Sequence, residues 1–161
     1  MNKQILKEEF GKGFKGIKFD YDEYTFTWGL SHHRFVKGLK ENFSSIEEFF
    51  KEIMLSPDTF SSHRVGEAFW IQRNNFAHFV DGLKFSQVSE EEFNNCILRS
   101  IIESKKYEQE IDLDKIEMPK THEKAITIKE TENPRFYINT YTGFISSNNN
   151  GYFFYELQFE S

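Results

Sequence analysis

The stretch FVKGLKENFSSIEEF, residues 35–49, is followed 44 positions later by FVDGLKFSQVSEEEF, residues 79–93. Aligning Phe35–Ser56 with Phe79–Ser100 requires no gap and gives 11 identities in 22 positions. Unrelated segments of ordinary composition share roughly one or two identities over that length. The sequence therefore contains an internal duplication, and a period of this size indicates a repeated supersecondary unit.

Each copy carries the start signal of an amphipathic helix. Ser45 and Ser89 each stand three residues before a glutamate, Glu48 and Glu92, which is the pattern of a capping box. Apolar residues then recur at helical spacing, and the first helix is expected to end before Pro57. These apolar residues are Ile46, Phe49, Phe50, Ile53 and Met54 in the first copy and Phe93, Cys96, Ile97 and Ile101 in the second.

Upstream of each helix the apolar pattern changes to the period of two that is typical of strands. The segments 23–30 and 67–72 are rich in aromatic and β-branched residues. Each is followed by a polar turn, SHH at 31–33 in the first copy, and then by a second apolar segment that contains Gly38 or Gly82. Each copy therefore predicts a hairpin followed by a helix.

The predicted fold is a duplicated ββα-ββα unit. Its copies, 23–56 and 67–100, are expected to form an antiparallel sheet with both helices on one face. Three further alternating segments, separated by turn residues, predict a C-terminal three-stranded antiparallel meander at about residues 124–160. The short segment 13–19 is similar to the repeat and is expected to add a strand. The fold class is α+β, in a single domain that covers residues 1–161.

Composition restricts the function classes. The 161 residues are 38% hydrophobic, 17% aromatic and 29% charged, with a net charge of −6. This balance predicts a folded protein and disfavours a general nucleic-acid binder, which normally has a concentrated basic face. The single cysteine fits a reducing compartment. The first ten residues lack the apolar region of a secretory signal, and no run is long enough to span a membrane. We therefore expect a cytoplasmic protein that does not bind membranes.

Histidines and carboxylates offer candidates for catalysis. An enzyme, such as a small hydrolase or nuclease, would use His63, Glu67 and His78. However, the sequence has neither a zinc-binding HExxH motif nor a nucleophile elbow near them. His32 and His33 are expected to lie in a solvated turn, because the second copy has no imidazole at the equivalent positions. We therefore expect no catalytic residue, no metal ion and no cofactor.

Two groups of residues are candidates for contact with a partner. An acidic segment follows the second helix, and aromatic residues occupy one face of the C-terminal strands. A solvated connector is the alternative for the acidic segment, and internal packing is the favoured alternative for the aromatic face. The candidate residues are Glu108, Glu110, Asp112, Asp114, Glu117, Tyr137, Tyr141, Tyr152 and Phe154.

In size, charge and composition, the acidic segment 108–117 included, the chain resembles bacterial toxin-immunity proteins of the contact-dependent growth inhibition type. The resemblance concerns the general profile of the whole chain and includes no signature motif. It implies a non-enzymatic protein that neutralises a cognate toxin domain, often a basic nuclease, by direct binding. Two alternatives stay open: the enzyme with His63, Glu67 and His78, and a module that binds single-stranded nucleic acid on its aromatic strands.

Overall fold

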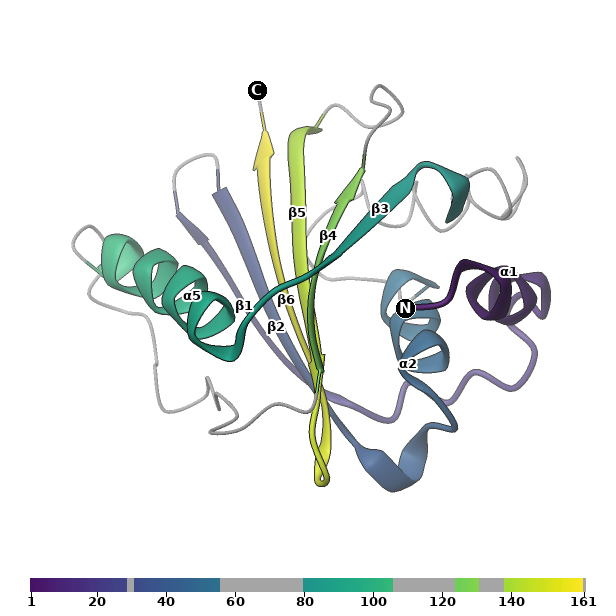
Figure 1. Ribbon diagram of the computed structural model, residues 1–161. Coiled ribbons are helices and arrows are strands. Elements are labelled where there is room, and N and C mark those ends of the chain that lie inside the picture. The colour runs from purple at the N-terminus through teal and green to yellow at the C-terminus, as the bar shows by residue number, and fades with distance from the viewer. Residues whose placement is uncertain (29–30, 56–79, 106–123, 131–137, 161) are drawn as a thin grey trace.

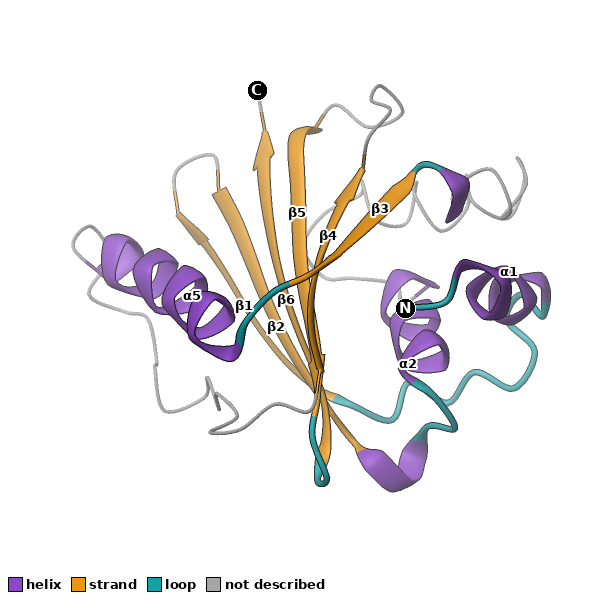
Figure 2. Ribbon diagram, viewed as in Figure 1, coloured by secondary structure: helices purple, strands orange, loops and turns teal. Residues whose placement is uncertain are grey.

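The computed structural model describes residues 1–28, 31–55, 80–105, 124–130 and 138–160. Within these ranges the chain is α+β, with three α-helices, one 3-10 helix and six strands (Figures 1 and 2). In chain order the elements are α1 (Lys3–Gly11), β1 (Asp22–Trp28), β2 (Ser31–Leu39), η1 (Lys40–Asn42), α2 (Ile46–Leu55), β3 (Leu83–Gln87), α5 (Glu90–Lys105), β4 (Lys124–Glu130), β5 (Ile138–Ser147) and β6 (Gly151–Glu160).

The six strands form one sheet in the order β1-β2-β6-β5-β4-β3, and every neighbouring pair is antiparallel. β6 therefore lies in the interior of the sheet and joins the hairpin β1-β2 to the strands β5, β4 and β3. Figure 2 shows α1 and α2 on one side of the sheet and α5 on the other. The described chain thus forms three layers, with the sheet in the middle.

Ring contacts along β6 show which helix covers which face. Phe154 contacts Phe50 of α2 edge to face, with ring centroids 6.0 Å apart. The next residue, Tyr155, stacks on Phe144 of β5 at 5.9 Å, and Phe144 contacts Phe93 of α5 at 5.9 Å. Successive side chains of a strand point to opposite faces. The expectation that both helices lie on one face is therefore wrong.

The predicted helix starts are confirmed. Ser45 Oγ accepts a hydrogen bond from the Glu48 backbone N–H at 3.1 Å, and Ser89 Oγ accepts one from the Glu92 N–H at 3.1 Å. The Glu48 carboxylate also accepts from the Ser44 N–H at 2.6 Å, which satisfies a second N–H at the start of α2. These bonds pair N–H groups that have no partner within the helix.

α1 was not predicted, although the sequence carries its signals. The Asn2 side chain accepts hydrogen bonds from the N–H groups of Gln4 and Ile5, as an N-cap does. Leu6 and Phe10, four residues apart, are fully buried, and Phe10 contacts the ring of Phe50 on α2. α1 therefore packs on the outside of α2 and extends the main core. Residues 13–19, where a strand was expected, form turns and irregular backbone.

The hairpin β1-β2 also differs from the prediction. β2 begins at Ser31, which pairs with Trp28, so the expected turn at residues 31–33 is instead the start of a strand. Gly38 lies within β2 opposite Tyr152, and a Cβ there would be 2.6 Å from the Phe43 ring and 2.8 Å from the Phe49 ring. Glycine is thus required at this position by close packing of aromatic rings.

The second copy of the repeat is described only in part. Its expected first strand, 67–72, lies outside the described residues. Val80 and Asp81, which were expected in the second strand, are helical, and the strand β3 begins at Leu83. Phe93 of the second copy is buried at 1% exposure, as Phe49 of the first copy is at 0%.

Candidate functional site

α5 has one buried side and one exposed side. Phe93 and Ile97 are 1% and 2% exposed and face the sheet, whereas Leu98 and Ile102 are 46% and 55% exposed. With 3.6 residues per turn, the positions i, i+4, i+7 and i+11 share one face of a helix. The outer face of α5 is defined here by Glu91, Asn95, Leu98 and Ile102, all of which are exposed.

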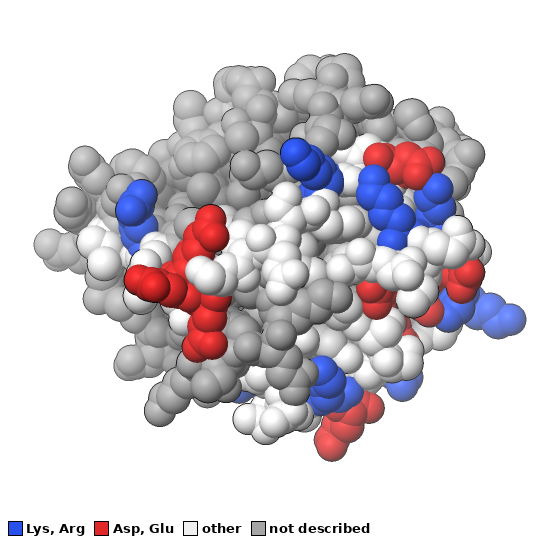
Figure 3. Space-filling view, viewed as in Figure 1, with Lys and Arg blue, Asp and Glu red and all other residues white. Residues whose placement is uncertain are grey.

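The N-terminal turn of α5 is acidic. Glu90, Glu91 and Glu92 are all exposed, and Figure 3 shows acidic side chains gathered where α5 begins. Carboxylates in a first helical turn are stabilised by the positive end of the helix dipole, so this acidity has a local structural cause. The aliphatic side chains of Leu98 and Ile102 have no comparable structural reason to be there, because neither belongs to the buried core. The exposure of these two aliphatic side chains therefore distinguishes the outer face of α5 from the polar, solvated face of an ordinary surface helix.

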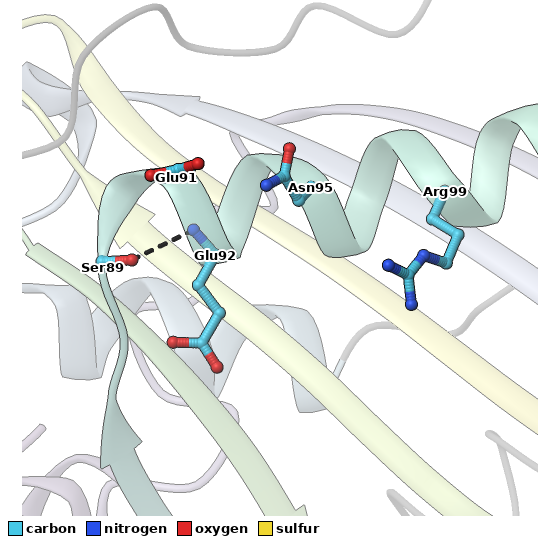
Figure 4. A pocket seen from close by; sticks show the side chains of 5 residues that line it. All are labelled: Ser89, Glu91, Glu92, Asn95 and Arg99. Carbon is cyan, nitrogen blue, oxygen red and sulfur yellow. Dashed lines mark hydrogen bonds between the residues drawn. The ribbon is translucent and has the colours of Figure 1, made fainter.

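A shallow recess of about 320 Å³ runs along the same helix. It is lined by Ser89, Glu91, Glu92, Asn95 and Arg99 (Figure 4). Figure 4 shows the side chains of Glu92 and Arg99 on one side of the helix, with Glu91 and Asn95 along the other. The carboxylates can accept hydrogen bonds from polar side chains of a partner, the guanidinium can donate them, and the amide can do both. Within the described ranges, no three His, Cys, Asp or Glu side chains come together as metal ligands would.

A charged cluster centred on the buried Arg34 lies at the other side of the sheet, where α2 ends. The Arg34 guanidinium donates to Glu23 through Nε at 2.7 Å and to the Ile53 carbonyl through Nη1 at 3.2 Å. Its Nη1 lies 3.7 Å from Oε2 of Glu156. The Ile53 carbonyl belongs to the last turn of α2, where carbonyls lack partners within the helix and the dipole is negative. Arg34 therefore ties α2 to β1, β2 and β6, with Arg34 and Glu156 buried and Glu23 at the surface.

His33 is buried rather than solvated, so the expectation of an exposed turn is wrong for this residue. It is 3% exposed, and its Nδ1 lies 3.0 Å from the hydroxyl of Tyr155, with the two rings stacked. The pair lies on the face of the sheet that α5 covers, since Tyr155 also contacts Phe144. Solvent does not reach either ring, which makes this a packing contact between β2 and β6.

The predicted partner contacts separate into three groups. Tyr152 and Phe154 are 5% and 2% exposed and pack in the main core, so internal packing, the favoured alternative, applies to them and they form no surface patch. Tyr141 lies in β5, and its side chain is not described. The remaining candidates lie outside the described residues: Glu108, Glu110, Asp112, Asp114, Glu117 and Tyr137, together with the catalytic alternatives His63, Glu67 and His78.

Leu98 and Ile102 were not among the predicted contact residues, although the sequence contains a signal for them. Once Phe93 and Ile97 are assigned to the buried side of the second helix, helical geometry places Leu98 and Ile102 away from it. Two large aliphatic residues that lie outside the buried side of a helix are a pattern that sequence alone can show.

No protein-family model matches this chain, and comparison with curated proteins and with solved structures likewise gives no match. None of the helices in the described ranges combines the length and apolar character that crossing a bilayer requires.

Proposed function

We propose that this chain is a non-enzymatic binding protein that holds a basic protein partner through the outer face of α5. The observation that carries the proposal is the exposure of Leu98 and Ile102 beside the acidic turn of Glu90, Glu91 and Glu92. Burying exposed aliphatic side chains stabilises a complex by about 25 cal/mol per Å² of apolar area. Carboxylates at the start of the same helix raise the rate of encounter with a basic surface and select against acidic partners.

The partner class follows from the resemblance to bacterial toxin-immunity proteins. In this proposal the chain is a cytoplasmic bacterial protein that neutralises a cognate toxin domain by covering its basic active site or substrate channel. The acidic residues Glu108, Glu110, Asp112, Asp114 and Glu117 follow α5 in the sequence and would extend the contact, with Tyr137 and Tyr141 as further candidates.

We also infer that the two halves of the repeat, 23–56 and 67–100, derive from one ββα unit. Serine caps at equivalent positions, Ser45 and Ser89, and buried phenylalanines at equivalent positions, Phe49 and Phe93, support this inference. The consecutive antiparallel pairing of β4, β5 and β6 supports the expected C-terminal meander, here as part of the same sheet as β1, β2 and β3.

The decisive experiment is co-expression with the product of the adjacent gene, followed by a binding measurement on the purified pair. Rescue of cell growth and a stable complex would support the proposal. The double substitution Leu98→Ser and Ile102→Ser should weaken binding at least about 30-fold, which is typical of residues at the centre of an interface. Leu39→Ser is the matched control, because Leu39 is 49% exposed at the end of β2, away from α5. Equal losses in both variants, or turnover of a substrate by the chain alone, would contradict the proposal.

A further inference from the structure

The segment between α1 and β1 is a basic and aromatic island in an acidic chain. Its sequence from Lys12 to Phe19 is KGFKGIKF, with a lysine at every third position and no carboxylate. Lys12, Lys15 and Lys18 are all exposed. The chain as a whole carries a net charge of −6, so this cluster of three positive charges is a local exception. The basic loop is defined here as residues 12–19.

The basic loop is held in a fixed shape by a buried carboxylate. Glu52 on α2 is 1% exposed, and its two oxygens accept hydrogen bonds from the backbone N–H groups of Lys18 at 3.2 Å and Phe19 at 2.9 Å. Ile17 packs against the main core. Gly13 and Gly16 have φ angles of 58° and 78°, which turn the backbone between the lysines. The loop is therefore anchored at several points along its length.

Two phenylalanines remain at the surface despite this anchoring. Phe14 and Phe19 are 46% and 38% exposed. Phe19 has a φ of 50°, which is rare for a bulky residue. Holding the backbone in this conformation costs a free energy similar in size to that of one favourable contact. Its ring also contacts Tyr21 edge to face, with centroids 6.5 Å apart. At these exposed fractions, part of each ring is accessible to solvent.

The lysines beside these rings are available to an anion. Lys12 is paired with Glu9, but within the described ranges neither Lys15 nor Lys18 has a carboxylate as an ion-pair partner. Solvent-accessible aromatic rings, close in sequence to lysines without a described carboxylate partner, are the two elements that single-stranded nucleic acids require, since bases stack on the rings and phosphates contact the cations.

We propose that the basic loop binds single-stranded nucleic acid without sequence preference, with bases on Phe14 and Phe19 and phosphates on Lys15 and Lys18. The site differs from the aromatic sheet suggested by the sequence, because Tyr152 and Phe154 are buried there. It is also independent of the outer face of α5, which lies on the opposite side of the sheet (Figure 1). Failure of either proposal therefore leaves the other unaffected.

The test is fluorescence anisotropy with the full chain and a labelled 12-residue oligothymidylate. At about 50 mM salt the dissociation constant is expected at or below the range of about 10⁻⁴ to 10⁻⁶ M that is typical of non-specific binding at physiological salt. Affinity should fall as salt rises, with a log–log slope of about −0.7 for each phosphate contacted. Phe14→Ala should weaken binding about tenfold by removing one stacking surface. Lys15→Gln should reduce the magnitude of the slope by about 0.7.

Matched controls separate this site from general attraction to anions. Lys84→Gln on β3 removes an exposed lysine elsewhere and should leave the affinity unchanged. A poly-glutamate peptide of equal charge offers no base to stack and should bind at least about tenfold more weakly. Absence of binding at 50 mM salt, equal binding of poly-glutamate, or preference for anionic phosphatidylserine vesicles would each overturn the proposal. An unchanged affinity in a folded Phe14→Ala variant, with native circular dichroism, would overturn it as well.

Discussion

Arg34 and Glu156 are direct partners across β2 and β6, and both side chains are only 1% exposed. Removing two charges from water is costly, and the cost is offset here by the second carboxylate, Glu23, and by the Ile53 carbonyl. The cluster joins the edge hairpin, the central strand and the end of α2. Its loss should therefore affect the stability of the whole sheet.

Arg34→Met is expected to destabilise the protein by about 3–5 kcal/mol, because it leaves Glu156 buried without its cation. Urea unfolding followed by circular dichroism measures the change. Arg99→Met on the exposed side of α5 is the control and should change the free energy of unfolding by less than about 0.5 kcal/mol. Similar effects of the two substitutions would show that the Arg34 cluster does not stabilise the fold.

Gly38→Ala should destabilise the protein by about 1–3 kcal/mol, since the new methyl group would overlap the rings of Phe43 and Phe49. Gly11→Ala at the end of α1 meets nothing within 4 Å and is expected to be neutral or stabilising by up to about 1 kcal/mol. Thermal unfolding of both variants measures the contrast. A stable Gly38→Ala variant would mean that the aromatic rings can move apart at little cost.

Glu48 and Glu52 lie one turn apart on α2 and are expected to titrate on opposite sides of the ordinary glutamate value. Burial acts to raise the pKa of Glu48, but hydrogen bonds from the Ser44 side chain and backbone outweigh it and lower that pKa. For Glu52 burial dominates and raises the pKa, although hydrogen bonds from Lys18 and Phe19 oppose it. Titration of the side-chain carboxyl carbons by NMR should show this order.

The two shifts have opposite consequences for stability. The contribution of Glu48 is present above the ordinary glutamate pKa and is lost as pH falls through its lowered pKa. For Glu52 the folded state binds the proton more tightly, so stability falls as pH rises from the ordinary value through the raised pKa. Glu48→Gln should therefore destabilise more at about pH 6 than at about pH 3, and Glu52→Gln should remove a pH dependence of the other sign. The same pH profile for both variants would contradict these assignments.

The orientation of α5 can be tested by stability alone. Phe93→Ala should cost about 3–5 kcal/mol, because the ring is 1% exposed and contacts Phe144. Leu98→Ala should cost less than about 1 kcal/mol, since that side chain is 46% exposed. Urea unfolding of both variants provides the comparison, and equal losses would mean that the outer face of α5 is covered within the chain.

Local features of this fold were predictable from sequence, whereas the arrangement of the layers was not. The caps Ser45 and Ser89, the helix ending at Leu55 and the strand Lys124–Glu130 depend on neighbouring residues, and the structure confirms them. The face that each helix covers depends on which strands pair, which is a long-range property. Phe49 and Phe93 occupy equivalent repeat positions and are equally buried, yet they lie on opposite faces of the sheet.

The candidate site shows the same division. The acidic first turn of α5, its buried side and the position of Leu98 and Ile102 away from that side were predictable from spacing alone, whereas the exposed fractions of these two side chains come from the structure. His33 was misplaced because a polar residue pair next to aromatic strands is typical of a turn. Its partner, Tyr155, lies 122 residues away, at a distance that local patterns do not detect.

The order of the strands also has a consequence for biosynthesis. β6 is the last of the six described strands to leave the ribosome, yet it is the one that pairs with both β2 and β5. Until it is made, the hairpin β1-β2 and the group β3, β4 and β5 have no hydrogen-bonded connection within the described sheet. A nascent chain without β6 would leave the edges of β2 and β5 open as well as those of β1 and β3 within the described sheet, a condition that favours aggregation and chaperone binding.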